Sequence, residues 1–221
     1  MANSQFPDLI KPVEPPPVQF DEPEVPFLVE VDEYVRAHQA RQLFQVSGQG
    51  LCAAVLDTGL NTRHVDFSGR IAAMRNFTPD NGGDADDVTD GNGHGTNVAG
   101  IVLAKGDHVG MAPEAMVAPL KVLANNGGGS FAWVDQALDW VLQNRADLNI
   151  SAVCMSLGDG ANYIDDEPFA STSVAQKIAD LRAARVAVVV AAGNDYFTHG
   201  SRQGMGFPAI VRQTVSVGAV Y

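Results

Sequence analysis

Residues 51–59 read LCAAVLDTG, an apolar run that ends in an acidic residue and a turn. The run is short, and its apolar residues do not alternate with polar ones. Strands buried on both faces show this pattern, and such strands form parallel sheets covered by helices. The stretch therefore predicts a central strand that carries Asp57 at its carboxyl end, the edge where open α/β sheets usually bind ligands.

Further apolar runs and two amphipathic segments extend this pattern along the chain. The runs occupy residues 116–123, 150–157, 186–192 and 214–220. Ser130 precedes one segment with helical spacing and Ser171 or Thr172 precedes the other, and hydroxyl side chains are favoured helix caps. This order of elements predicts an α/β fold with a mostly parallel central sheet. Pro119 weakens the prediction for its own strand, because proline cannot donate to a central ladder.

The first 35 residues differ in composition from the rest of the chain. They are rich in proline and acidic residues, a composition that propagates neither a helix nor a ladder. We expect an extended arm over residues 1–35 and one domain over residues 36–221. Residues 34–44 have rough helical spacing and predict a helix where the two parts meet.

Composition and charge narrow the classes of protein and partner. The 221 residues are 46% hydrophobic and 18% charged, which suffices for a buried core, and the net charge of −12 disfavours a nucleic-acid partner. No apolar run reaches the ~18 residues typical of a spanning helix, so we expect no membrane partner. No signal segment is visible, and the compartment stays unknown. Cys52 and Cys154 lie in apolar runs and predict buried free thiols.

Three polar residues at element ends are candidates for catalysis. Asp57 can accept a hydrogen bond from an imidazole and fix its tautomer, although an Asp-Thr-Gly turn alone needs no such role. His94 lies between two glycines at the start of a small-residue helix and is a candidate general base. Asn194 follows the run at 186–192 and can donate its amide to an oxyanion, while a simple turn beside Gly193 explains it equally well.

Two further segments are candidates for binding an extended peptide. Strand addition needs exposed backbone more than particular side chains, and glycines leave backbone accessible. The candidate residues are Gly127, Gly128, Gly129, Ser156, Leu157 and Gly158. Without the other motifs, the three glycines indicate only a loop.

The three catalytic candidates occur in the order DTG, GHGT and GN, each next to a predicted strand or helix. In this order and context they resemble the subtilisin-like serine peptidases, over residues 49–221. The resemblance implies a three-layer subtilisin-like fold and a serine endopeptidase that cleaves extended peptide or protein substrates without a required cofactor. It also implies that Asp57 orients the base, His94 is the base, Asn194 is the oxyanion donor, and the two binding segments flank the substrate. Members of the family are often secreted.

The chain departs from the family pattern at the nucleophile. The Gly-Thr-Ser-Met-Ala segment that supplies the catalytic serine in the family does not occur in the 221 residues. Ser156 falls in the substrate-binding strand of the family and lacks a nucleophile elbow. We therefore expect an incomplete subtilisin-like domain, with its C-terminal part missing, that is inactive alone. Asn97 also departs from the histidine common at that position, which leaves the proposed triad unchanged.

An acidic loop between Asp57 and His94 is a weaker candidate for a calcium site. It contains Asp80, Asp84, Asp86, Asp87 and Asp90. Many relatives in the family bind calcium, and carboxylates are suitable ligands, but the spacing lacks the helix-loop-helix calcium pattern. A solvated acidic loop is the favoured interpretation.

Two functions therefore stay open. The first is a subtilisin-like endopeptidase represented without its serine, and the second is a truncated pseudopeptidase that binds peptides or complements a partner chain. A truncated sheet would also expose apolar surface near residues 186–192 and 214–220. Because such surface promotes association, we expect contacts with other molecules through this edge.

Overall fold

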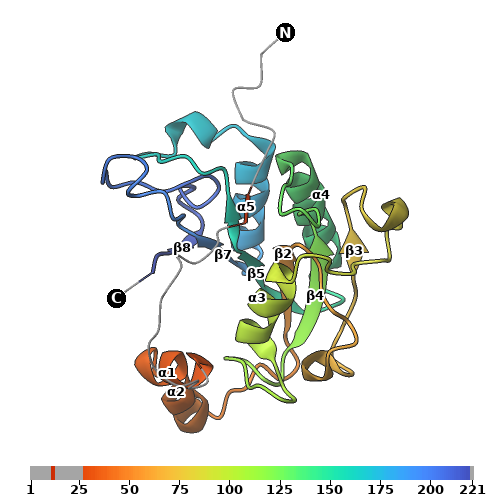
Figure 1. The fold of residues 1–221 in the computed structure, drawn as a ribbon. Helices are drawn as coiled ribbons and strands as arrows, with labels where there is room; N and C mark the ends of the chain where they lie inside the picture. The colour runs from red at the N-terminus through yellow and green to blue at the C-terminus, as the bar shows by residue number, and fades with distance from the viewer. Residues whose placement is uncertain (1–10, 13–26, 220–221) are drawn as a thin grey trace.

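The computed structural model describes residues 11–12 and 27–219, and its centre is a six-stranded sheet (Figure 1). The strand order is β3-β4-β2-β5-β7-β8, and every pairing in this sheet is parallel. The strands are β2 (Cys52–Asp57), β3 (Arg75–Asn76), β4 (Met116–Lys121), β5 (Ile150–Met155), β7 (Ala187–Ala191) and β8 (Val215–Val217). The predicted α/β class with a mostly parallel sheet is confirmed.

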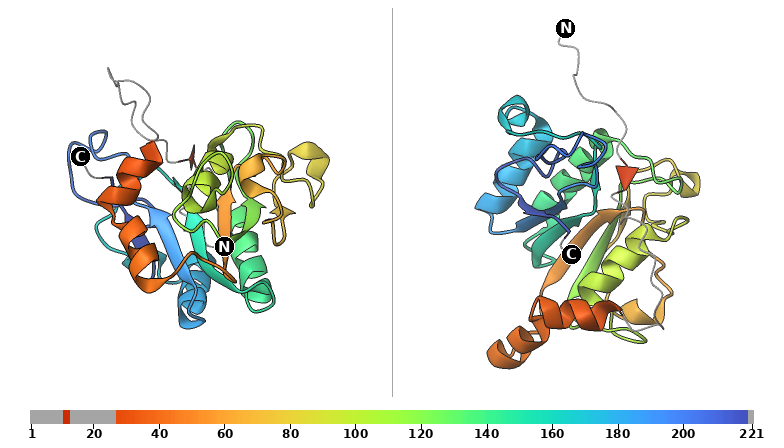
Figure 2. Two further views of the ribbon diagram at one scale, coloured as in Figure 1. Left: turned by 90° about the horizontal axis from the view of Figure 1, so that it is seen from below. Right: turned by 60° about the vertical axis from the view of Figure 1, so that its left-hand side comes forward.

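Three helices cover the sheet on both sides (Figure 2). Helix α3 (His94–Leu103) lies on one face, and α4 (Phe131–Asn144) and α5 (Ser173–Ala183) lie side by side on the other. Ser130 Oγ accepts from Ala132 N and Thr172 Oγ1 accepts from Ala175 N, so both predicted caps are confirmed, the second with Thr172 as the capping residue.

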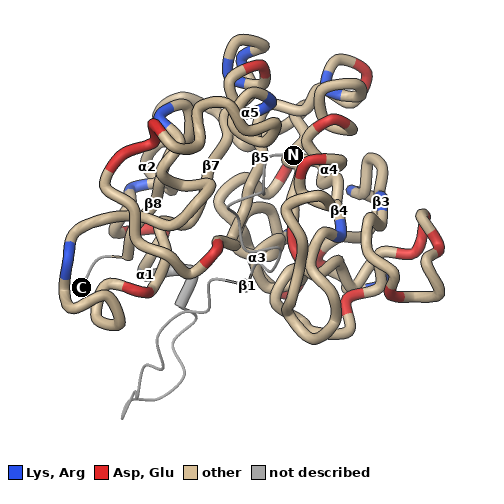
Figure 3. Tube along the Cα trace, turned by 90° about the horizontal axis from the view of Figure 1, so that it is seen from above, with Lys and Arg blue, Asp and Glu red and all other residues tan. Residues whose placement is uncertain are grey.

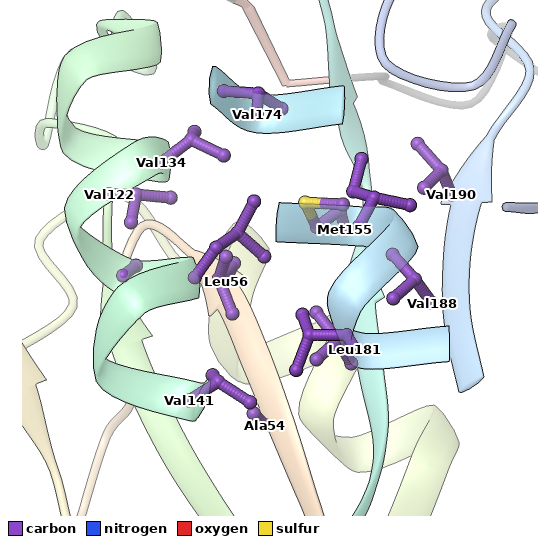
Figure 4. Packing of buried hydrophobic residues seen from close by; sticks show 14 of the residues in the cluster. Ala54, Leu56, Val122, Val134, Val141, Met155, Val174, Leu181, Val188 and Val190 are labelled. Carbon is purple, nitrogen blue, oxygen red and sulfur yellow. The ribbon is translucent and has the colours of Figure 1, made fainter. Parts of the chain in front are cut away.

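Successive residues of β2 point into two different cores. Ala54 and Leu56 pack with α4 and α5, as Figure 4 shows, whereas Ala53 and Val55 pack with α3. All six residues of β2 are buried. The two cores explain why the sequence of this strand is apolar without alternation.

Pro119, which weakened the prediction of a strand over these residues, lies inside β4. It pairs with Val55 of β2, while β3 pairs with only Leu120 and Lys121. The described ladders therefore give Pro119 a partner on one side only. This one-sided pairing accommodates a residue that has no N–H to donate.

The structure near the N-terminus differs from the predicted arm and helix. Phe27–Tyr34 forms helix α1, although we expected extended chain up to residue 35, and Ala37–Phe44 forms a separate helix α2. Arg36 has φ 59°, a left-handed conformation that ends one helix before the next begins. No proline occurs after Pro26 in this stretch, which permits both helices. Residues 1–10 and 13–26 of the predicted arm lie outside the described residues.

The sheet edge is less exposed than we expected. Val188 and Val190 of β7 are buried at 1% and 0% exposure, because their side chains pack in the core that contains α4 and α5. Val215 and Val217 of β8 are 48% and 51% exposed. The prediction of exposed apolar surface was therefore wrong for β7, and it holds for β8.

The cysteines and the helices give two further observations. Cys52 and Cys154 carry free thiols, as predicted, and burial raises the pKa of each to about 11.

Within the described residues, no helix has the length and apolar content to cross a membrane.

We predict that Leu138→Ala lowers the free energy of unfolding by about 2–5 kcal/mol, because Leu138 on α4 is fully buried against the sheet. The control Leu43→Ala removes a side chain that is 75% exposed, and it should change stability by less than about 0.5 kcal/mol. Urea unfolding of both variants measures the difference. Equal stability of the two variants would contradict the described core.

Candidate active site

Asp57 and His94 meet at the carboxyl end of β2. Asp57 ends the strand with no exposed surface, and its Oδ1 lies 2.7 Å from His94 Nδ1. The same oxygen accepts from Thr58 N at 2.7 Å. His94 is the first residue of α3, and its side chain is 14% exposed. The buried carboxylate is thus hydrogen-bonded to Nδ1 of a histidine ring that is partly exposed at the surface.

This arrangement fixes the chemistry that the imidazole can perform. A carboxylate that accepts from Nδ1–H selects the tautomer in which Nε2 is the unprotonated nitrogen. Nε2 can then remove a proton, and the buried carboxylate stabilises the imidazolium that forms. The geometry suits a general base oriented by an acid.

Glycines permit the close approach of the two elements. A Cβ placed on Gly95 would lie 2.4 Å from the carbonyl oxygen of Gly59, far closer than any real contact. Gly59 also has φ 118°, and a Cβ there would lie 2.3 Å from Val88 O. Contact with backbone thus explains Gly59 of the DTG motif and Gly95 of the GHGT motif, while Gly93 has φ 101°, a conformation that favours glycine.

Asp90 and Thr58 connect the strand end to the start of α3. Thr58 Oγ1 donates to Asp90 Oδ1 at 2.9 Å and accepts from Gly95 N at 2.8 Å. Asp90 also accepts from Gly93 N, Thr96 N and Thr96 Oγ1. Burial alone would raise the pKa of Asp90, but the hydrogen bonds from Thr96, Gly93 and Thr58 lower it below its ordinary value. The carboxylate caps the helix that carries His94.

The other carboxylates of the acidic loop do not converge. Asp84 accepts from Asp86 N, Asp87 accepts from Thr89 N, and Asp86 lies 3.5 Å from Arg75. Figure 3 shows acidic positions along this loop beside β3. Among the described residues, no three His, Cys, Asp or Glu side chains form a group that could hold a metal ion. From the sequence, Asp90 was predicted only as a metal candidate, and its capping role was missed, although the DxxGHGT spacing could have indicated it.

Asn194 lies beyond the carboxyl end of β7. Gly193 before it has φ 111°, and Asn194 is exposed. β7 and β2 are both neighbours of β5, so their carboxyl ends lie on one edge of the sheet. The role of Asn194 as an oxyanion donor stays a prediction.

The two predicted binding segments differ in their backbone pairing. Leu157–Gly158 forms strand β6, which pairs antiparallel with β1 (Lys11–Pro12) of the same chain. In the glycine segment, Gly127 N donates to Ala124 O and Ala124 N donates to Gly128 O, which closes a turn. Gly129 forms an antiparallel bridge with Leu123. Pairing with an extended segment is thus observed at β6.

Comparison with known proteins identifies the class. Residues 48–221 match the Subtilase family of peptidases. The chain is 35% identical over 179 residues to an intracellular serine protease of Paenibacillus polymyxa, which covers 80% of this chain and 51% of that protein. It is 33% identical over 197 residues to the major intracellular serine protease of Bacillus subtilis, which covers 86% of this chain and 58% of that protein. It is 36% identical over 176 residues to proteinase T of Parengyodontium album, at 78% and 53% coverage.

The chain belongs to the subtilase family, as the resemblance in its sequence predicted, and the family is one of serine-type peptidases. It spans about half the length of the curated relatives that it matches, 51% and 58% of the first two.

We predict that Asp90→Asn destabilises the chain by about 1–3 kcal/mol at pH 7, the range for hydrogen bonds to a charged group. Because the pKa of Asp90 is lowered in the folded chain, its contribution is present above the unfolded pKa of about 3.9 and is lost as the pH falls through the folded pKa. The variant and the parent should therefore converge in stability as the pH falls through the folded pKa of Asp90, which lies below its ordinary value.

Urea unfolding at pH 7 and at low pH measures this difference. Asp86→Asn is the control, because the Asp86 side chain is 79% exposed. A pH-independent difference between Asp90→Asn and the parent would show that the carboxylate has no such role.

Proposed function

We propose that this chain provides the acid and base of a subtilisin-like serine endopeptidase, with Asp57 orienting His94 and His94 acting as the general base. The observation that supports this most strongly is the 2.7 Å contact between Asp57 Oδ1 and His94 Nδ1 at a fully buried carboxylate. Asn194 is the proposed oxyanion donor. In the reaction, Nε2 would take the proton of a serine hydroxyl and return it to the leaving amine.

We further propose that these 221 residues alone do not hydrolyse peptide bonds. Their sequence lacks the Gly-Thr-Ser-Met-Ala segment of the family. Ser156 directly precedes β6, which pairs with β1, so its segment belongs to a strand-pairing edge rather than to a nucleophile turn.

Two measurements test the absence of hydrolysis. The first is labelling of the chain with a fluorophosphonate, followed by mass spectrometry, and the second is a hydrolysis assay on a fluorogenic peptide. We expect neither label nor hydrolysis above the level of a His94→Ala variant. A label on any serine that disappears in His94→Ala would overturn this part of the proposal. Such a result would leave the roles of Asp57 and His94 intact.

The second part of the proposal is that β6 binds an extended peptide by adding a strand. The antiparallel pairing of Lys11 with Gly158 and of Pro12 with Leu157 supports it, because the chain itself supplies an extended segment at that edge. This pairing favours the peptide-binding function independently of any nucleophile. A peptide substrate would compete with β1 for the same edge.

We predict that Lys11→Pro strengthens the binding of a fluorescein-labelled extended octapeptide by about 2- to 10-fold, the equivalent of one hydrogen bond. Proline at position 11 removes the remaining N–H of β1, since Pro12 already lacks one. Fluorescence anisotropy measures the affinity. The control peptide carries N-methyl groups on alternate amides and should bind weakly to both chains. Equal binding of the two peptides would contradict strand addition.

A further inference from the structure

Lys121 is a fully buried cation directly beside the candidate active site. It is the last residue of β4, pairs in register with Asp57 of β2, and has no exposed surface. A buried ammonium is costly unless its donors are satisfied. Its Nζ donates to Thr58 O at 2.5 Å, to Leu123 O at 3.0 Å and to Asn125 Oδ1 at 2.9 Å. All three ammonium protons therefore have acceptors.

Two of these acceptors lead to opposite halves of the Asp57–His94 pair. Thr58 is the residue that follows Asp57, so the bond from Lys121 to Thr58 O holds the chain as it leaves β2. Asn125 Oδ1 also accepts from Gly91 N at 3.0 Å, and Asn125 O accepts from Asn92 Nδ2 at 3.2 Å.

The Asn125 branch continues to the base itself. Asn92 Oδ1 accepts from His94 N at 3.3 Å. Gly91 fits tightly on Asn125, since a Cβ there would lie 2.6 Å from Asn125 Cγ. One ammonium group is thus connected by short chains of contacts to the acid on one side and to the base on the other.

The charges around Lys121 are consistent with a fixed position. Its Nζ lies 3.6 Å from Asp80 Oδ2, and Asp80 Oδ2 also accepts from Asn125 N at 2.6 Å. Burial lowers the pKa of Lys121, while Asp80, Asp90 and Asp57 oppose this shift. These three carboxylates, from β2 and the acidic loop, favour the charged form of Lys121.

We propose that Lys121 is a positioning residue that sets the hydrogen bond between Asp57 and His94 by holding the loops that follow β2 and precede α3. The proposal rests on the proposed roles of Asp57 and His94. In the described part of the chain, the Lys121 ammonium donates to Thr58 O, Leu123 O and Asn125 Oδ1, and we propose that it acts on the pair through Thr58 and Asn125. Removing it should loosen the pair even where the sheet remains folded.

The test is an NMR measurement on the full chain labelled with ¹⁵N-histidine. A proton shared between Nδ1 and a carboxylate gives a distinct downfield resonance, and this signal assigned to His94 reports the contact. We expect it in the parent chain, and we expect it to be lost or moved upfield in Lys121→Met. The matched control is Lys177→Met, which removes another largely buried lysine, bound to Asp135 and Asp139 on the far side of the sheet. That control should lose stability and retain the signal.

A second variant decides the question if Lys121→Met does not fold. Asn125→Ala removes an exposed side chain, and with it the contacts of Asn125 Oδ1 with Lys121 Nζ and Gly91 N, while the bond from Lys121 to Thr58 O and the main-chain contact of Asn125 with Asn92 remain. We expect a smaller upfield movement of the same resonance. An unchanged resonance in a folded Lys121→Met, or in Asn125→Ala when the first variant is unfolded, would overturn the proposal. Because the readout needs neither hydrolysis nor peptide binding, a failure of the proposed function would show separately in the peptide assays.

Discussion

The site depends on one buried carboxylate at the end of a central strand. Asp57 has no exposed surface, and a buried carboxylate requires hydrogen-bond donors. Thr58 N and His94 Nδ1 supply them to Oδ1, whereas Oδ2 has no hydrogen-bond partner among the described residues. The His94 ring can donate to Asp57 only if the first residue of α3 lies against the end of β2. Gly95, the residue after His94, permits that approach, because a Cβ there would collide with Gly59 O. The geometry of the acid–base pair thus follows from the packing of one helix start on one strand end.

The surrounding loops hold this arrangement with polar contacts in addition to apolar packing. Asp90 caps α3 and binds Thr58, while Lys121 binds Thr58 O and Asn125. The apolar cores on the two faces of the sheet also include Leu60 after β2 and Leu123 after β4, so they anchor the loops as well as the strands. Such loops at the strand ends are where α/β proteins commonly place their functional residues.

The sequence was sufficient to predict the sheet, its parallel direction and the Asp57–His94 pair. Buried strands and capped helices have local signals, and the motifs lie at their ends. The two-residue strand β3 was missed because it depends on pairing with β4, which is distant in sequence. The helix Phe27–Tyr34 was missed because the proline-rich composition before it indicated extended chain. The roles of Asp90 and Lys121 were missed for a similar reason, since an aspartate in an acidic loop and a lysine at a strand end have common solvated alternatives. The pairing of β1 with β6 joins residues far apart in the chain, and no local pattern predicts it.

Asp57 fixes the tautomer of His94 in which Nε2 is the unprotonated nitrogen, and the proposed role of His94 as a base depends on this tautomer. A long-range ¹H–¹⁵N correlation spectrum of the histidine-labelled chain, recorded at a pH where the ring of His94 is neutral, measures the tautomer directly. The account predicts that the proton is on Nδ1, and that Asp57→Asn abolishes this preference. A neutral ring with its proton on Nε2 in the parent chain would contradict the account.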